Sequence, residues 1–157
     1  RGATRWISAL QAASAASSCM AKLRRAGSAW AGSTWKLDAV DGADALRLLD
    51  AAITRSGGET SREDVLGEIL SGRATVFPGE QSVMICTLHE DAGGKREGHV
   101  WLAAGKLSEL RGPLREQAEQ WARLNGADTA SIDGRDGWAR ALQGVGFNGT
   151  GEIRKVL

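Results

Sequence analysis

The stretch that most constrains the fold of this chain is WARLNGADTASIDGRDGW, residues 121–138. It predicts the end of an amphipathic helix, a glycine-containing turn at Asn125-Gly126, a short strand over 129–132, and a second helix that begins near Trp138. A strand enclosed by two helices is typical of α/β domains, in which ligands usually bind where a strand ends. The segment Gly134-Arg135-Asp136-Gly137 therefore lies where a binding site is expected.

An apolar stripe leads into this unit. Apolar residues recur at steps of three and four along the preceding segment, at Leu107, Leu110, Leu114, Ala118 and Trp121. This spacing places them on one face of a helix, and such a face needs a sheet to pack against. The sequence thus predicts a helix, a strand and a helix in succession.

The rest of the chain from residue 37 onward continues the α/β pattern. Thr60 and Glu63 have the spacing of a capping box and predict the start of a helix that ends at Gly72. Period-two alternation and turn residues predict an antiparallel meander of strands between residues 74 and 103. The remaining predictions are strands over 37–40, 74–77, 81–88, 99–103 and 153–157, a polar loop over 91–98, a helix over 45–53, and a short helix from Trp138 to Leu142.

Length and composition indicate a single domain that needs neither disulfides nor a metal. A chain of 157 residues can bury a full core. Cys19 and Cys86 fit no metal-binding spacing and are too few for a disulfide framework, so reduced thiols in a cytosol-like compartment are expected. With His89 and His99 as the two histidines, no metal site is expected. No apolar run approaches the length of a membrane span, so no membrane contact is expected.

The net charge of +1 conceals a basic arm on an acidic body. Residues 1–36 contain six basic residues and no acidic residue, which leaves 14 basic and 19 acidic residues for 37–157. The arm is rich in Ala and Ser, with Trp6, Ile7 and Leu10 at helical spacing. It predicts a helical extension whose narrow apolar face needs the body or a partner to bind it. Nucleic-acid binding is not expected, because the charges form no clustered basic face.

Several interpretations of the first residues stay open. Met20 opens the run MAKLRR, so residues 1–19 are expected to be upstream sequence, a tag remnant or a processed terminus. The arm also has the composition of an organellar transit peptide, and Cys19 follows small residues as in a weak lipoprotein signal. The simplest interpretation is a flexible or docked arm.

Several short motifs together resemble a known family. The most specific is Gly134-Arg135-x-Gly137-Trp138, and the others are Ser56-Gly57-Gly58-Glu59, Glu63-Asp64-Val65, Trp121-Ala122-Arg123, Gly126 and Gly146-Phe147. In these motifs the chain resembles the small GNAT-fold (N-acetyltransferase-like) proteins encoded by tailed phages and prophages, over residues 37–157. The resemblance implies a mixed central sheet with splayed parallel strands and helices on both faces. It also implies a location in the host cytoplasm or in the phage virion.

The resemblance implies a binding site for acetyl-CoA. In GNAT domains the pyrophosphate rests on backbone amides at a glycine-rich turn between the fourth strand and the helix that follows it. The matching segment here begins at Ala103, and the implied cofactor-binding residues are Ala103, Gly105 and Lys106. The segment holds one glycine where the family has a series.

Arg135 is a further candidate for binding an anionic ligand. It lies at a predicted strand end beside a helix N-terminus, a position suited to bidentate donation to an anion. The alternative is that Arg135 ties down its own loop by pairing with Asp133 or Asp136.

The catalytic groups that the resemblance implies are only partly present. Many GNAT enzymes use a tyrosine to protonate the leaving thiolate, and this sequence contains no tyrosine. Cys86, Ser131 or a water molecule would take that role. The general base would be Glu90 or His89 at the end of the long strand, with His99 on the next strand as a third candidate. The alternative for each is a solvated residue at a strand end.

Two functions follow from these patterns. The first is acetyl transfer from acetyl-CoA to an amine. The second is a catalytically silent GNAT-like module that binds protein, either as a virion-associated partner of a phage structural protein or by self-association through the basic arm. The opposite charges of arm and body favour the second, because a basic arm can lie along an acidic neighbour.

Overall fold

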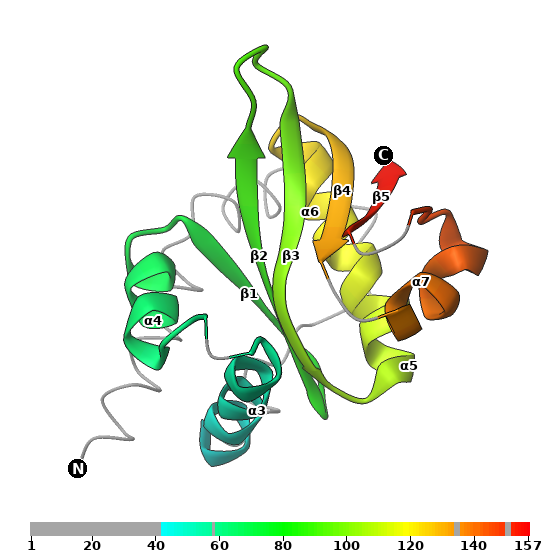
Figure 1. The fold of residues 1–157 in the computed structure, drawn as a ribbon. Helices are drawn as coiled ribbons and strands as arrows, with labels where there is room; N and C mark the ends of the chain where they lie inside the picture. The colour runs from blue at the N-terminus through cyan, green and yellow to red at the C-terminus, as the bar shows by residue number, and fades with distance from the viewer. Residues whose placement is uncertain (1–41, 58, 134–135, 150–151) are drawn as a thin grey trace, which may run out of the picture.

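The computed structural model describes residues 42–57, 59–133, 136–149 and 152–157, and its fold is drawn in Figure 1. The predicted arm over 1–36, the strand over 37–40 and the candidate Arg135 lie outside the described residues. The elements, in chain order, are α3 (Gly42–Arg55), α4 (Arg62–Leu70), β1 (Ala74–Pro78), β2 (Ser82–Glu90), β3 (Arg96–Gly105), α5 (Leu107–Glu109), α6 (Arg115–Leu124), β4 (Ala127–Asp133), α7 (Asp136–Leu142) and β5 (Glu152–Val156).

One mixed sheet organises these elements and confirms the predicted α/β class. Its five strands lie in the order β1-β2-β3-β4-β5. The predicted antiparallel meander is confirmed for β1, β2 and β3, and β5 is antiparallel to β4. Only β3 and β4 pair in parallel. Because a parallel pair needs a long crossover, the chain between β3 and β4 forms the helix that was predicted from the apolar stripe.

The parallel pairing covers only the first half of β3. It runs from Arg96 opposite Ala127 to Val100 opposite Ile132, whereas β3 continues to Gly105. Trp101 is an extra residue in β3, because Ile85 of β2 faces Leu102 and Cys86 faces Val100. Such a bulge bends and twists the strand. Among the described residues, the second half of β3 has no partner strand on its β4 side.

The cap of α4 lies one residue later than predicted. Ser61 has an extended backbone and its hydroxyl accepts a hydrogen bond from the Asp64 backbone N–H at 3.1 Å. The Asp64 carboxylate in turn accepts from the Ser61 N–H at 3.1 Å. Aspartate here takes the place that glutamate usually has in a capping box, so the pair is Ser61 and Asp64 rather than Thr60 and Glu63.

The helix predicted from the apolar stripe is interrupted. Between α5 and α6 lies a π-helical turn, Leu110–Leu114, in which Gly112 has a non-helical backbone (φ −102°, ψ −108°) beside Pro113. Proline lacks the N–H that an uninterrupted helix needs at that position. The stripe is buried after this break, but Leu107 precedes it and is 49% exposed, contrary to the prediction that it packs on the sheet.

Helices cover both faces of the sheet (Figure 1). On one face α3 and α4 bury Leu49, Val65 and Ile69 against Val83, Ile85 and Leu102. On the other face α6 and the turn before it pack against the alternate residues of the same strands, and a further cluster forms under α7. Within the described residues, no helix combines the length and the apolar character that a bilayer crossing needs.

α6 approaches the sheet closely at Gly98. A Cβ atom at this position would lie 2.6 Å from the Cβ of Ala122. By contrast, a Cβ at Gly67, in the middle of α4, would meet nothing within 4 Å. The two glycines therefore make a matched pair for testing how closely the crossover helix lies against β3.

We expect Gly98→Ala to lower the free energy of unfolding by about 1–3 kcal/mol, because the added methyl overpacks the contact with Ala122. We expect Gly67→Ala to raise it by about 0.4–1 kcal/mol, since alanine restricts the unfolded chain and fits the helix. Urea unfolding followed by circular dichroism measures both. Equal effects of the two changes would contradict the close packing of α6 on β3.

Candidate functional site

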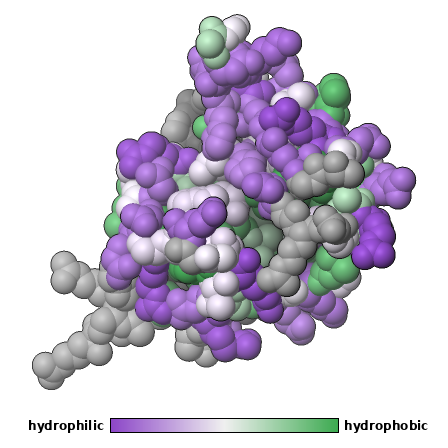
Figure 2. All heavy atoms as spheres, in the orientation of Figure 1, coloured by the Kyte–Doolittle hydropathy of each residue, from purple (hydrophilic) through white to green (hydrophobic). Residues whose placement is uncertain are grey.

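Polar side chains gather on one face of the sheet, beyond the part that α3 and α4 cover. Strand alternation and register place them side by side on β2, β3, β4 and β5. Figure 2 shows hydrophilic residues over this upper part of the molecule. We call this set the polar sheet face, and it comprises Thr87, His89, Glu97, His99, Thr129, Ser131, Asp133, Glu152 and Arg154.

A chain of hydrogen bonds links β3 to β4 at the centre of the polar sheet face. Nδ1 of His99 lies 2.9 Å from the hydroxyl oxygen of Ser131, which has no exposed surface. The Ser131 hydroxyl donates to Oε1 of Glu97 at 2.7 Å, and the Thr129 hydroxyl donates to Oε2 at 3.3 Å. The parallel register produces this arrangement, because it sets His99 opposite Ser131 and Glu97 opposite Thr129.

This chain of hydrogen bonds selects the tautomer of His99. An ionised carboxylate can only accept, so the hydrogen of Ser131 points to Glu97. The oxygen of Ser131 then accepts from His99, whose Nδ1 must carry a hydrogen. In a neutral imidazole this leaves Nε2 with its lone pair. His99 is thus arranged to accept a proton at Nε2.

The surroundings of His99 also favour its neutral form. Burial, followed by the charge of His89, lowers the pKa of His99 from its ordinary value. The two rings lie 5.2 Å apart, centroid to centroid. Glu97, Glu152 and Asp133 act in the opposite direction, but their effect on this pKa is smaller. Its surroundings thus lower the pKa of His99 and favour the neutral, proton-accepting form of the ring.

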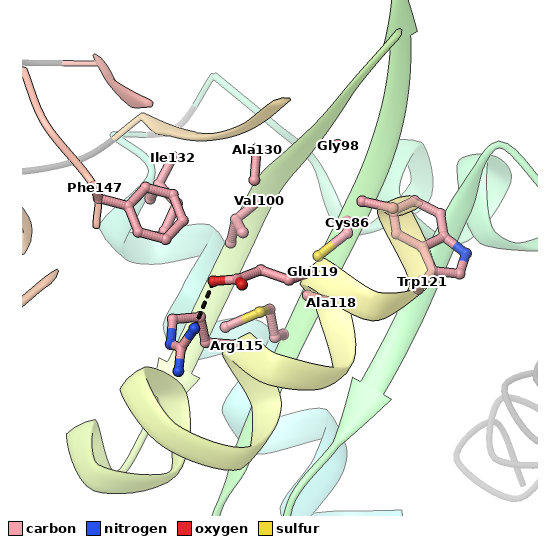
Figure 3. A pocket seen from close by; sticks show the side chains of 12 residues that line it. Cys86, Gly98, Val100, Arg115, Ala118, Glu119, Trp121, Ala130, Ile132 and Phe147 are labelled. Carbon is pink, nitrogen blue, oxygen red and sulfur yellow. Dashed lines mark hydrogen bonds and ion pairs between the residues drawn. The ribbon is translucent and has the colours of Figure 1, made fainter. Parts of the chain in front are cut away.

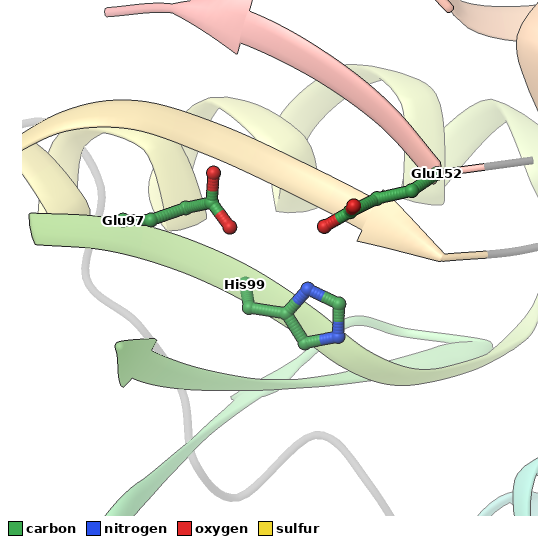
Figure 4. Close-up of side chains that lie close together, drawn as sticks. All are labelled: Glu97, His99 and Glu152. Carbon is green, nitrogen blue, oxygen red and sulfur yellow. The ribbon is translucent and has the colours of Figure 1, made fainter. Parts of the chain in front are cut away.

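Two carboxylates converge on the same place from separate strands. Figure 4 shows Glu97 and His99 on β3 with Glu152 reaching toward them from β5. Arg154 bridges the two carboxylates, at 3.1 Å from Glu97 and 3.2 Å from Glu152. Its side chain is 59% exposed, so this cation lies at the solvent edge of the cluster.

The structure brings His89 and His99 together on the polar sheet face and separates Glu90 from them. His89 is exposed at the rim of the polar sheet face, where Nε2 lies 3.0 Å from the Thr87 hydroxyl. Glu90 alternates to the other side of β2 and pairs with Arg96 at 2.8 Å. Only His99, the third candidate, has partners that fix its orientation and tautomer.

The predicted cofactor-binding residues lie at the opposite end of β3. Gly105 faces Ser82 in the sheet and the exposed Lys106 follows it, whereas His89 is seven residues further along β2, or roughly 24 Å away. The backbone N–H of Lys106 donates to the Ser82 hydroxyl at 2.9 Å. Ala103 is half-buried and packs toward α6. The predicted bases and the predicted cofactor turn are therefore not neighbours.

One cavity in the interior of the described region is too small for a ligand. It lies between α6 and the sheet and is lined by Cys86, Gly98, Val100, Arg115 and Phe147, among others (Figure 3). It leaves about 10 Å³ for the centre of a water molecule, which is room for at most one water. Burial raises the pKa of the Cys86 thiol. Cys86 therefore faces this closed interior as a neutral thiol, away from the polar sheet face.

A second charged cluster lies beside this cavity and has a structural role. The side chain of Glu119 is 6% exposed and accepts from Arg115 at 2.6 Å and from Lys155 at 2.9 Å. Arg123 lies 3.5 Å away. A buried carboxylate needs such compensation, and here the ion pair of Glu119 with Lys155 connects α6 to β5.

Sequence reasoning missed Glu97, Glu152 and Arg154. The strands were predicted to begin at residues 99 and 153, so the first two fell into loops. The signal that could have found them is alternation, since Glu97 and His99, like Glu152 and Arg154, are two residues apart and share one face of a strand.

No family model matches the chain, and no curated protein or solved structure matches it either.

Titration should show the electrostatic environment of His99. We expect NMR to give a pKa for His99 below its ordinary value of 6.5, and His89→Gln to raise that pKa because it removes a like charge. The folded chain then binds fewer protons at His99 than the unfolded chain, so the free energy of unfolding falls as pH drops below about 6.5. An ordinary pKa for His99 in both the wild type and the His89→Gln variant would contradict the burial of His99 and its proximity to His89.

The cluster around Glu119 can be tested against its exposed neighbour. We expect Glu119→Gln to lower the free energy of unfolding by about 3 kcal/mol, because Arg115 and Lys155 lose their buried carboxylate. Glu116, whose side chain is 64% exposed, also pairs with Arg115, and Glu116→Gln should cost less than about 1 kcal/mol. Chemical unfolding of the two variants checks the difference.

Proposed function

We propose that this chain is a GNAT-like domain that transfers an acetyl group from acetyl-CoA to an amine, with His99 as the general base. The observation that carries the proposal is the position of His99. It lies next to the point where β3 and β4 cease to pair, and its Nε2 lone pair is set by Ser131 and Glu97. A base held beside an opening between two parallel strands suits an acyl-transfer site.

The arrangement of elements supports the GNAT-like part of the proposal. Two helices precede the strands, a helix crosses between the parallel strands β3 and β4, and α7 leads into an antiparallel last strand. The pairing of β3 with β4 stops at Val100, and the strand continues for several residues. This agrees with the splayed parallel pair that the resemblance implies.

The unpaired half of β3 is suited to hold the pantetheine arm of acetyl-CoA. Backbone N–H and C=O groups on an open strand edge can bond the amides of an extended ligand, much as they would bond another strand. The edge runs from Trp101 to Gly105. Lys106 follows it and brings an exposed ammonium to the end where the pyrophosphate would lie.

His99 would act on the acceptor rather than on the thioester. Acetyl transfer forms a C–N bond as the C–S bond breaks, and a proton must leave the attacking amine. Nε2 of His99 accepts that proton, and the departing thiolate takes one from water. Ser131 and Glu97 keep the ring oriented and stabilise the imidazolium that results.

One observation favours the second candidate, a catalytically silent binding module. At the turn after β3, the Lys106 N–H is already bonded to Ser82, and the Glu109 carboxylate accepts from Gln81 at 3.1 Å. A carboxylate beside a turn repels phosphate, and each bonded N–H is one donor fewer. In this reading the partner is a phage structural protein, or a second copy bound through the arm of residues 1–36.

Calorimetric titration with acetyl-CoA decides between the two candidates. For the enzyme we expect binding, release of CoA thiol in the presence of a panel of primary amines, and a rate at least about 100-fold lower in His99→Gln with acetyl-CoA affinity unchanged. Glu68→Gln, which alters the ion pair between Glu68 on α4 and Arg73 beyond that helix, serves as the control and should keep the full rate. Absence of binding at millimolar acetyl-CoA would overturn the enzyme and support the module.

A further inference from the structure

We propose that Glu97, His99 and Glu152 form a binding site for a divalent transition-metal ion, and that Arg154 is the cation that competes with the metal for it. One ligand atom from each of the three residues lies within 4.8 Å of the others (Figure 4). This inference does not rest on the acetyltransferase proposal, since it concerns binding alone.

The three side chains come from a rigid part of the fold. Glu97 and His99 alternate on β3, and β4 lies between them and Glu152 on β5, all within one hydrogen-bonded sheet. Sites built on strands hold their ligands better than sites on loops. Zinc ligands lie about 2.0–2.2 Å from the metal, so the cluster must contract. The Glu152 side chain is 43% exposed and can rotate inward to do so.

The partners of the three residues resemble the outer shell of known metal sites. The hydroxyls of Ser131 and Thr129 both donate to Glu97 and hold its carboxylate in place. Ser131 also lies 2.9 Å from Nδ1 of His99, so a metal bound at that nitrogen would move its hydrogen to Nε2, while a metal bound at Nε2 would leave this hydrogen bond in place. In metal centres such outer hydrogen bonds orient the ligands, and their loss weakens metal binding.

Arg154 indicates that this place already favours positive charge. Its guanidinium pairs with both Glu97 and Glu152, the two carboxylates that would bind the metal. Exposed ion pairs of this kind are weak, and the Arg154 side chain can move into solvent when a stronger cation arrives. Arginine and metal are therefore alternative occupants of one site.

The ligand types indicate the class of metal. One imidazole nitrogen with two carboxylate oxygens suits first-row transition-metal ions such as Zn²⁺, Co²⁺ and Mn²⁺. The same ligand set suits Ca²⁺ or Mg²⁺ poorly, because these ions prefer oxygen ligands alone. Three protein ligands leave a coordination position for water. A metal bound here would also occupy the space in front of His99, so it would block that residue from acting as a base.

Zn²⁺ calorimetry and Co²⁺ absorption spectroscopy on the full chain without a histidine tag test this site. We expect visible Co²⁺ bands, and Zn²⁺ affinity at least about tenfold lower in Glu152→Gln and in His99→Gln. Arg154→Ala should instead bind Zn²⁺ at least about tenfold more tightly, because it removes the competing cation. Mg²⁺ should bind weakly to all of these proteins.

The ion pair between Glu68 on α4 and Arg73, which follows that helix, supplies matched controls, since its side chains are about as exposed as those of Glu152 and Arg154. Glu68→Gln and Arg73→Ala should leave the Zn²⁺ affinity unchanged. Glu152 and Arg154 are both exposed, so their variants keep the test decisive even if His99→Gln fails to fold. Wild-type affinity in Glu152→Gln, or no gain in Arg154→Ala, would overturn the proposal.

Discussion

The parallel pairing of β3 with β4 is the constraint on which the rest of the structure depends. Parallel neighbours cannot be joined by a hairpin, so the chain must cross one face of the sheet between them. That crossing is α6, and its buried residues Ala118, Trp121 and Ala122 pack into the core on that face. The same pairing places His99 beside Ser131 and Glu97 beside Thr129. One register therefore fixes both the packing of the crossover helix and the hydrogen bonds of the candidate site.

Alternation along β3 divides the molecule into a closed face and an open one. Gly98 and Val100 face α6 and line the small cavity there, and the buried carboxylate of Glu119 beside them is surrounded by cations. His99, which lies between these two residues, and Glu97, which precedes Gly98, face the opposite side of the sheet and are only partly buried. Among the described residues, the polar sheet face therefore offers His99 and its carboxylates to solvent, while the charges opposite it are paired in the interior.

The order of helices and strands could be predicted from the sequence, because each element carries its own period. The apolar stripe that ends at Trp121 and the alternation of β2 are local signals, and the structure has elements there. Local reasoning failed where two signals compete. Gly112 and Pro113 interrupt a stripe whose spacing predicts one continuous helix. Ser61 caps α4, although Thr60 beside it is also a residue type that commonly caps helices.

The candidate site could be predicted only in part, because its bonds depend on register. Ser131 and His99 are 32 residues apart in the chain and meet only through the parallel alignment. His89 and Glu90 were favoured as bases because they end a long strand, yet alternation sends Glu90 to the opposite side. Glu152 and Arg154 lie near Glu97 because β5 pairs with β4, and the sequence alone does not indicate which strand β5 pairs with. Periodicity identifies faces, whereas only pairing identifies neighbours.

The charges on the polar sheet face determine which kinds of ligand can bind there. Among the described residues, the carboxylates of Glu97, Glu152 and Asp133 surround His99, with the guanidinium of Arg154 beside them, and this excess of carboxylates favours cations over phosphates. A phosphate-bearing cosubstrate must therefore keep its anionic end away from this cluster. The end of β3 at Lys106 is six residues beyond Val100, or roughly 20 Å away. In the proposed enzyme, an extended thioester lying along β3 would satisfy both demands, with its pyrophosphate at Lys106 and its acyl group near His99.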